Sequence, residues 1–488
     1  MPDFDVVVIG AGAAGLSVAA ISARLGLKVA LIERGRMGGD CLNYGCVPSK
    51  ALLAAGHAAA AARAAHRFGI RLPAPEIDWA GVRAHVQGAI SRIAPTDSAE
   101  RFRGMGVEVI QASACFTAPD RIEAGGRSLS FRRAVIAAGS SAVVPDLPGL
   151  DGVPWLTNES LFTLEEPPGH LIILGGGPIG LEMAQAHVRL GCLVTVIEAA
   201  PRIAMREDPE LVEGMQAALL ADGVEFREGV KVTRLEQLEP DSKAAQAGVV
   251  AVLEDGSRIA GTHLLLAVGR APRLAGLDLV AAQVEAGPRG IVTGADLRSV
   301  SNRRVWAVGD IADPRGIGPR AFTHVASQHA GILVRSMLFR LPFTKVDYAA
   351  LPRVTYTDPE LAQIGLTEAE AREQGHADVT VQHCSLAEND RAIAEGRPEG
   401  PQAGMMKLVI GKGGRLLGAG VLAPRAGEMA GMFGLMIGRK LPLSALAGLV
   451  LPYPTLAEAA KRAAGAHYTP KLLSPFTKRV IGLLKRLP

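Results

Sequence analysis

Apolar and polar positions near the N-terminus follow the pattern of a strand, a turn, a helix and a second strand. The apolar run 4–9 leads into a glycine-rich turn, and Ala-rich helical sequence continues as far as Arg24. A second apolar run, 28–33, ends in the acidic Glu33. Short apolar runs bounded by glycines indicate buried strands. The turn contains Gly10, Gly12 and Gly15.

The same pattern recurs 165 positions further along the chain, with an apolar run at 171–174 and a second strand that ends in Glu198. Glycines at this spacing allow a tight turn, close approach of a pyrophosphate and close helix–strand packing. The helix N-terminus supplies donors to phosphates, and the acid accepts from ribose hydroxyls. One copy would also fit an ordinary strand–helix turn, whereas two predict two dinucleotides that exchange electrons. The second turn contains Gly175, Gly177 and Gly180.

The acid of the second copy predicts which nicotinamide binds. A carboxylate at Glu198 suits free ribose hydroxyls and repels a 2′-phosphate, so NADH is favoured over NADPH. Arg202 follows four residues later and is the alternative partner for such a phosphate.

Two cysteines, Cys41 and Cys46, lie five positions apart in a glycine-rich segment that precedes a helical stretch. A helix N-terminus lowers the pKa of a thiol, and Lys50, one turn beyond Cys46, adds positive charge. A redox-active dithiol is therefore expected. The alternatives are a structural disulfide, half of a zinc site without a second ligand pair, and two inert buried thiols. The remaining cysteines lack such a context and are expected to be structural: Cys115, Cys192 and Cys384.

The run Gly-Gly-Asp-Cys-Leu-Asn-Tyr-Gly-Cys-Val-Pro-Ser-Lys, residues 38–50, resembles the redox motif of the class I pyridine nucleotide-disulfide oxidoreductases. This family includes dihydrolipoamide dehydrogenase, glutathione reductase and mercuric reductase, and the resemblance extends over about residues 4–470. It implies FAD in the first fingerprint and a nicotinamide cofactor in the second. It also implies a homodimer whose C-terminal domain completes the partner's active site.

Three further segments resemble family signatures and follow in the expected order. The segment 136–140 is similar to the end of the first FAD segment, and 266–270 to the close of the nicotinamide domain. The segment 305–310 is similar to the second FAD motif, whose Asp310 would hold ribityl hydroxyls. The resemblance thereby adds to the cofactor-binding residues Gly39, Lys50, Gly139, Ser140, Gly269, Asp310 and Thr323.

The resemblance also implies roles at the dithiol. Cys41 would be the interchange thiol that meets the substrate, and Cys46 the thiol next to the flavin. Lys50 and Glu182 would pair beside the isoalloxazine. Glu182 follows closely on Gly180, so its alternative role is to interact with the N-terminal dipole of that helix.

The chain departs from the family near its C-terminus. Where most members have a histidine base, this sequence has Tyr453, whereas the glutamate that would orient the base is present as Glu458. A tyrosine with a pKa near 10 is a poor base at neutral pH. Mercuric reductase also has a tyrosine at this position. The alternative for Tyr453 is a packing residue at the dimer interface.

The electron acceptor is expected to be a disulfide, as in dihydrolipoamide dehydrogenase. A mercuric or other metal-ion reductase is the alternative, although the chain has neither a terminal cysteine pair nor an N-terminal module with paired cysteines. A dithiol-independent flavin NADH oxidase or quinone reductase is a second alternative. No resident metal site is expected, because no second Cys/His pair has ligand spacing.

Two histidines follow the Asp310 motif on an apolar helix, His324 and His329. A histidine on an apolar face is usually a satisfied core residue. The resemblance, however, puts the helix start near Thr323 and His324 against the flavin, so this start is expected to line the cofactor.

Composition narrows the class of protein. At roughly 150 residues per domain, the 488 residues predict about three domains. A net charge of +4 and 4% aromatic residues argue against nucleic acid as a partner. The uncharged stretch between Asp5 and Arg24 is interrupted by glycines, so it is expected to be strand, turn and helix rather than a membrane span. With five cysteines and no signal peptide pattern, a cytoplasmic protein is expected.

The predicted fold class is α/β, with two Rossmann-like domains, the second inserted in the first, and a C-terminal α+β dimerisation domain. Residues 1–150 and 271–346 would bind FAD, 151–270 would bind NAD(H), and 347–470 would form the dimer. The tail 471–488 has five basic residues and no acidic one, and its apolar residues are spaced for one helical face. We expect this helix to dock on the protein, and the alternative is weak contact with a membrane surface.

Overall fold

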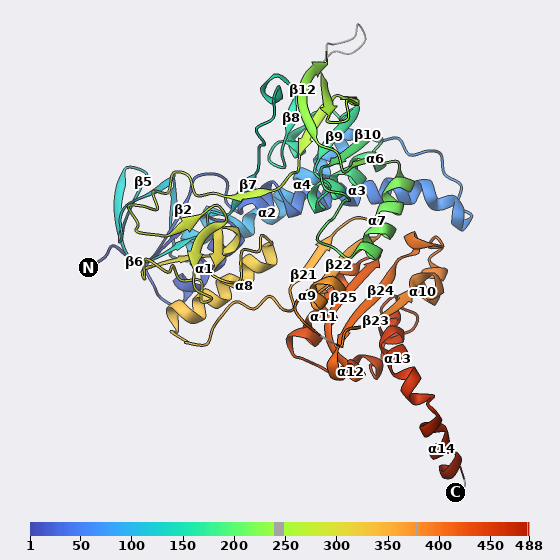
Figure 1. The fold of residues 1–488 in the computed structure, drawn as a ribbon. Helices are drawn as coiled ribbons and strands as arrows, with labels where there is room; N and C mark the ends of the chain where they lie inside the picture. The colour runs from blue at the N-terminus through green and yellow to red at the C-terminus, as the bar shows by residue number, and fades with distance from the viewer. Residues whose placement is uncertain (239–247, 377, 486, 488) are drawn as a thin grey trace. The chain divides into compact units, whose positions relative to one another are not determined.

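The computed structural model describes residues 1–238, 248–376, 378–485 and 487 (Figure 1). The chain divides into two compact units, each built from three separate segments. The predicted nicotinamide-binding and dimerisation segments fall largely in the second unit. The first unit contains 1–54, 78–167 and 263–346, and the second contains 55–77, 168–262 and 347–488.

The first unit is built on a parallel sheet whose central strands are β1 (Phe4–Ile9) and β6 (Arg127–Ile136). Almost every side chain of β1 is buried, as expected for a strand of a sheet that is covered on both faces. Strands β2 (Val29–Glu33), β3 (Glu108–Gln111) and β19 (Val305–Ala307) extend the parallel part. The uncharged stretch after Asp5 is therefore a strand, a turn and a helix, as predicted.

Helices of the first unit connect and flank these strands. They are α1 (Ala13–Arg24), α2 (Gly39–Asn43), α4 (Trp79–Asp97), α5 (Ala99–Gly104) and α8 (Thr323–Leu333). Helix α3 (Cys46–Ala64) begins in the first unit and ends in the second. Helices α1 and α8 contact each other, although about 300 residues separate them.

The second unit repeats the strand–helix–strand arrangement. Strand β9 (His170–Leu174) leads through α6 (Pro178–Arg189) to β10 (Leu193–Glu198), and α7 (Pro209–Asp222) leads to β11 (Glu225–Glu228). All three strands are parallel, in the order β11-β10-β9. An antiparallel ribbon of β12 (Val232–Leu238), β13 (Gly248–Leu253) and β14 (Arg258–Gly261) follows.

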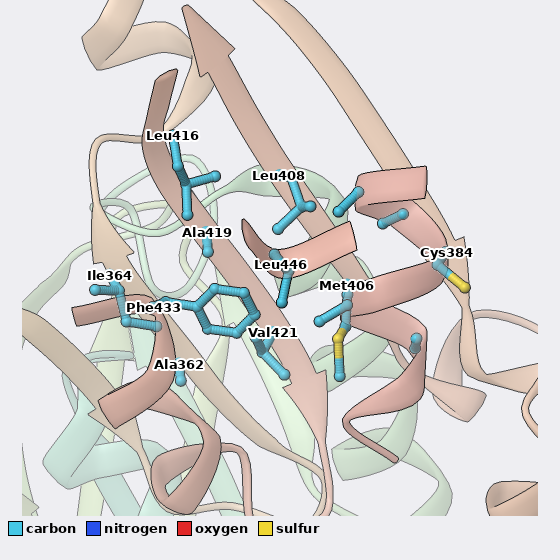
Figure 2. Close-up of a cluster of buried hydrophobic side chains, with 14 of the residues drawn as sticks. Ala362, Ile364, Cys384, Met406, Leu408, Leu416, Ala419, Val421, Phe433 and Leu446 are labelled. Carbon is cyan, nitrogen blue, oxygen red and sulfur yellow. The ribbon is translucent and has the colours of Figure 1, made fainter. Parts of the chain in front are cut away.

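The C-terminal part of the second unit is a five-stranded antiparallel sheet with helices packed on it. Figure 2 shows Phe433 of α11 (Ala426–Gly438) among Ile364, Ala419 and Val421 of the sheet, in one buried cluster. Helices α12 (Leu443–Ala447) and α13 (Glu458–Leu472) contribute to the same core. The strands, in spatial order, are β21 (Pro352–Thr355), β22 (Glu360–Gly365), β25 (Arg415–Ala423), β24 (Met405–Gly411) and β23 (Thr380–Ser385).

These observations confirm the predicted fold class, with two dinucleotide-binding folds and an α+β C-terminal part. The shorter elements complete the two units without changing that architecture. They are β4 (Ala114–Ala118), β5 (Arg121–Ala124), β7 (Ser140–Ala142), β8 (Trp155–Leu156), β15 (His263–Leu266), β16 (Arg270–Pro272), β17 (Ala286–Gly287), β18 (Gly290–Thr293), β20 (Ala312–Pro314), α9 (Glu368–Glu373) and α10 (Asp390–Ala394).

The chain ends in helix α14 (Pro475–Leu484), which buries none of its side chains. The expectation that this helix docks on the protein is therefore wrong for the chain itself, because its large apolar side chains Phe476, Ile481, Leu483 and Leu484 are 50–75% exposed. Among the described residues, no helix combines the length and apolarity needed to cross a membrane.

Candidate active site

The two cysteines lie where two helices of the first unit begin. Cys41 is within α2, and Cys46 is the first residue of α3. Gly38 precedes α2 with a φ of 89°, and a Cβ there would overlap the Leu42 side chain, so the turn requires glycine. Both sulfurs are free thiols, with Cys46 exposed and Cys41 half-buried.

The two thiols differ in acidity because they form a hydrogen bond with each other. That bond, together with a contact of 3.2 Å from Cys46 Sγ to Thr323 Oγ1 and the charge of Lys50, lowers the pKa of Cys46 to about 6. The same bond and burial raise the pKa of Cys41. The negative charge of the reduced pair therefore resides on Cys46, at a helix N-terminus that stabilises it.

A chain of polar contacts links the loop before Cys41 to the later family-like segments. Asp40 Oδ1 lies 3.1 Å from Arg270 Nη2, and Arg270 Nε donates to Ser140 Oγ at 2.8 Å. Ser140 Oγ in turn donates to Asp310 Oδ2 at 2.6 Å. Partial burial raises the pKa of Asp310. The buried Asn158 also donates to Asp40 Oδ1, at 3.0 Å.

The segments that contain Gly139 and Gly269 also meet directly. Strand β7 pairs antiparallel with β16, and Val143 N donates to Gly269 O at 3.0 Å. The sequence had indicated Gly139, Ser140, Gly269 and Asp310. It did not indicate Arg270 or Asn158 as members of this network, and no spacing rule would have found them.

The first glycine-rich turn has the shape that a dinucleotide requires. A Cβ at Gly15 would overlap the Gly10 carbonyl oxygen, and one at Gly39 would lie 2.7 Å from Gly12 Cα. Gly12 caps α1 without a side-chain hydrogen bond, so the first N–H groups of that helix are available to a phosphate. Larger side chains at these glycine positions would fill the space beside the turn, so the residues present fit FAD.

The acid at the end of β2 is held by the same turn. Glu33 accepts hydrogen bonds from Ala11 N at 2.6 Å and Gly35 N at 2.7 Å. A carboxylate has about four acceptor positions, so two remain for ribose hydroxyls.

The second turn reproduces these contacts. Glu198 accepts from Gly176 N and Ala200 N, both at 2.7 Å, and a Cβ at Gly180 would overlap the Gly175 carbonyl oxygen. The two copies are thus alike in hydrogen bonding as well as in sequence, and the second also fits a dinucleotide. Gly177 begins α6 as Gly12 begins α1.

Arg202 does not face outward to a phosphate. Its guanidinium donates to four backbone carbonyls, those of Ile203, Ala204, Met205 and Glu207, at 3.0–3.2 Å. This arrangement disfavours the alternative in which Arg202 receives a 2′-phosphate, because the loop 203–207 already engages both terminal nitrogens.

Lys50 lies on α3 in the first unit, and Glu182 lies on α6 in the second, so their pairing stays a prediction. Glu182 is buried and accepts from Tyr356 N at 3.0 Å. It lies beyond the first turn of α6, which contains no acidic residue, so the helix-dipole alternative for Glu182 is wrong.

Tyr453 is 71% exposed, and its hydroxyl donates to Asp390 Oδ2 at 2.8 Å. This hydrogen bond raises the pKa of Tyr453, so the phenol stays protonated near neutral pH and is not available as a general base. Glu458 is the first residue of α13 and accepts from Thr455 N at 3.4 Å. Asp390 was not expected at this position, because its sequence context has no catalytic motif.

The two histidines of α8 have different surroundings. His329 is buried, accepts from Gly309 N at 3.1 Å through Nδ1, and has its pKa lowered to about 4 by burial. It is the satisfied core histidine that the sequence suggested. The exposed His324 stacks on Phe322, with ring centroids 5.1 Å apart.

The other cysteines differ from the pair. Burial raises the pKa of Cys192 to about 11 and also raises that of Cys384, so both remain protonated. Cys115 is half-buried on β4, and its thiol lies 3.7 Å from Phe116 O.

Comparison with known proteins identifies a family over most of the chain. Residues 4–330 match the family described as pyridine nucleotide-disulphide oxidoreductase, and 351–464 match its dimerisation domain. The chain is 34% identical to mercuric reductase of Streptomyces lividans, covering 94% of this chain and 95% of that relative. It is 33% identical to dihydrolipoyl dehydrogenase of Thermus scotoductus, with 96% and 98% covered.

Solved structures agree with this result. The HOCl-induced flavoprotein disulfide reductase RclA from Escherichia coli superposes with a TM-score of 0.82 at 27% sequence identity. The match covers 94% of this chain and 99% of that one.

Proposed function

Because the chain belongs to the pyridine nucleotide-disulphide oxidoreductase family, we propose that it passes electrons from NADH through FAD to Cys41 and Cys46, and on to a disulfide acceptor. The observation that carries the proposal is the unequal acidity of the two thiols, with the pKa lowered at Cys46 and raised at Cys41. Bound FAD would supply the two-electron step between nicotinamide and sulfur.

The thiol steps balance with these two residues. Two electrons and one proton convert the Cys41–Cys46 disulfide to a Cys46 thiolate and a Cys41 thiol. The Cys46 thiolate accepts the Cys41 proton while the Cys41 sulfur attacks the acceptor, which forms a mixed disulfide and releases one thiolate. That thiolate takes the proton from Cys46, whose sulfur then attacks Cys41 and restores the internal disulfide. The second product sulfur leaves as a thiolate, which takes a proton from water.

The cofactors would be held by the two glycine-rich turns. The N-termini of α1 and α6 would bind the pyrophosphates, and Glu33 and Glu198 the riboses. Asp310, oriented by Ser140 and Arg270, would hold ribityl hydroxyls. The remaining residues proposed for cofactor contact are Gly39, Lys50, Gly139, Thr323, Glu182 and Gly269.

NADH is proposed as the reductant in preference to NADPH. Glu198 places a carboxylate at the end of β10, where a 2′-phosphate would be repelled. The donors of Arg202 that would compensate are used by the loop 203–207.

A metal-ion acceptor is the second candidate, and one observation favours it. Tyr453 is engaged with Asp390 and has a raised pKa, so no general base for a disulfide substrate is present at this position. Relatives of similar identity include mercuric reductases, which supports the same candidate.

A homodimer is proposed because the second unit contains the family's dimerisation domain. Large apolar side chains in that segment are exposed, including Leu435, Leu449 and Val450. Burial of such residues is what an obligate interface supplies.

The test is NADH oxidation by the FAD-loaded protein with lipoamide and, separately, with thiol-complexed mercuric ion. Turnover with lipoamide that is lost in both Cys41→Ser and Cys46→Ser supports the disulfide proposal. Turnover with mercuric ion alone replaces it with the metal-ion candidate. Cys115→Ser, which changes a half-buried thiol elsewhere in the first unit, is the matched control.

The dithiol-independent oxidase or quinone reductase is distinguished by the same variants. NADH oxidation that persists at the wild-type rate in Cys46→Ser with oxygen or a quinone, and is absent with both other acceptors, would overturn the proposal. Retention of flavin by the variant, measured by absorbance, ensures that a loss of turnover is not a loss of cofactor.

A further inference from the structure

The C-terminal helix lies outside both family-matched segments, which end at residues 330 and 464. It is a helix in its own right, because Ser474 accepts from Thr477 N as the N-cap and Pro475 occupies the first turn. Figure 1 shows α14 at the end of the chain, beyond α13. The family match therefore does not explain the distribution of side chains on α14.

The helix has two chemically distinct faces. Lys478, within the helix, and Lys485, its C-cap, are seven residues apart and share one face, and both are exposed. The opposite face is apolar, with Phe476 75% and Leu483 66% exposed. Residues 471–488 contain five basic side chains and no acidic one.

We propose that α14 is a peripheral anchor that lies on an anionic phospholipid bilayer. A cationic amphipathic helix places its apolar face at the headgroup–acyl boundary, while its lysines stay near the phosphates. Exposed phenylalanine and leucine opposite a lysine row have the arrangement that such a surface stabilises. The proposal does not depend on the electron acceptor.

A second copy of the helix is less suited than a bilayer to cover the apolar face. Leu473, Phe476, Val480, Leu483 and Leu487 follow a 3–4 spacing, but only for about two heptads, below the roughly three to four that a coiled coil needs. Two such helices would also bring together charges of one sign, without acidic partners. An anionic surface has the complementary charge.

The experiment is co-sedimentation of the full-length, FAD-loaded protein with vesicles of phosphatidylcholine alone or mixed with phosphatidylglycerol. We expect binding to the mixed vesicles, and at least about tenfold weaker binding to the neutral ones. In about 1 M salt, where the screening length falls to about 3 Å, the protein should leave the mixed vesicles.

Three double variants test whether α14 is responsible for the binding. Lys478→Glu/Lys485→Glu should reduce partitioning at least about tenfold, because each basic residue near the surface contributes separately. Lys231→Glu/Lys412→Glu makes the same change of charge at exposed lysines elsewhere in the second unit and should bind as wild type. Phe476→Ser/Leu483→Ser tests the apolar face and, since α14 buries no residue, should leave circular dichroism and flavin content unchanged.

Equal partitioning of the two lysine variants would overturn the proposal, as would absence of wild-type binding to the mixed vesicles. If Phe476→Ser/Leu483→Ser instead lowers the oligomer mass in light scattering and leaves vesicle binding intact, the apolar face belongs to a second copy and the anchor is wrong.

Discussion

At the scale of single residues, the chemistry depends on which of two sulfurs carries the charge. Cys46 is stabilised as a thiolate by three groups, the Cys41 thiol, the Thr323 hydroxyl and the Lys50 ammonium. Cys41 remains protonated because it donates to Cys46 and because it is partly buried. In a pair polarised in this way, the Cys41 sulfur is the nucleophile, and the Cys46 thiolate that accepts its proton is already hydrogen-bonded to it.

The first prediction concerns the pH at which this thiolate is lost. Since the pKa of Cys46 is lowered to about 6, the thiolate should be present above pH 6 and become protonated below it. Ultraviolet absorbance of the reduced protein against pH measures this, with Cys46→Ser as the baseline. Thr323→Val removes a hydrogen bond to the charged sulfur and should raise the midpoint by about one unit. A midpoint that stays near 9 in the wild type would contradict the assignment.

The second prediction concerns Tyr453. Its hydroxyl donates to Asp390 and its pKa is raised, so it does not act as a base near neutral pH. Tyr453→Phe should therefore leave the pH profile of acceptor reduction unchanged. Tyr453→His should increase lipoamide turnover at least about tenfold, because a positioned general base contributes a factor of this order or more. The rate of flavin reduction by NADH is the internal control. A lipoamide reaction that is faster in Tyr453→Phe than in the wild type would show that the Tyr453 hydroxyl affects acceptor reduction, and would contradict this prediction.

At the scale of elements, one strand–turn–helix motif occurs twice and has the same hydrogen bonds in both copies. Glu33 is bonded to the N–H groups of residues 11 and 35, and Glu198 to those of residues 176 and 200. All of these partners differ by 165 positions, as the glycines do. In both copies the acid therefore fixes the loop after the first strand.

The third prediction separates the two copies. Gly180→Ala places a Cβ against the Gly175 carbonyl oxygen, so the turn must shift, and KM for NADH should rise at least about tenfold while FAD is retained. Gly15→Ala makes the corresponding change in the first copy and should release FAD instead. Gly465→Ala, where a Cβ meets no other atom within 4 Å, is the matched control. Loss of FAD from Gly180→Ala would show that the assignment of the copies is reversed.

These devices were predictable from the sequence because each is local: apolar strands, turn glycines and a closing acid follow one another within about 25 residues. Contacts that arise only from packing were not. Arg270 reaches Ser140 across 130 positions, and Asp390 reaches Tyr453 across 63, and neither contact leaves a spacing pattern. For α14, the helix and its apolar face were predicted correctly from the sequence. The sequence did not indicate what covers that face, so the predicted docking on the protein was wrong.

At the scale of the whole molecule, several large apolar side chains of the second unit are exposed to solvent. Val450 is 91% exposed in the loop that precedes Tyr453, within the segment that matches the dimerisation domain. An isolated exposed valine needs no explanation, and Val280 in the first unit, 89% exposed, is one example. Val450 differs because Leu449 beside it and Leu435 on α11 are exposed in the same unit.

The fourth prediction uses this pair of valines. If the C-terminal segment forms the dimer, Val450→Asp buries a charge in the interface and should convert the protein to monomers in light scattering at low concentration. Val280→Asp makes the same substitution at equal exposure and should stay dimeric. Because the family resemblance implies that the partner's C-terminal domain completes the active site, Val450→Asp should also lose acceptor turnover while still oxidising NADH at the flavin. A dimer that survives Val450→Asp with full turnover would move the interface away from this loop.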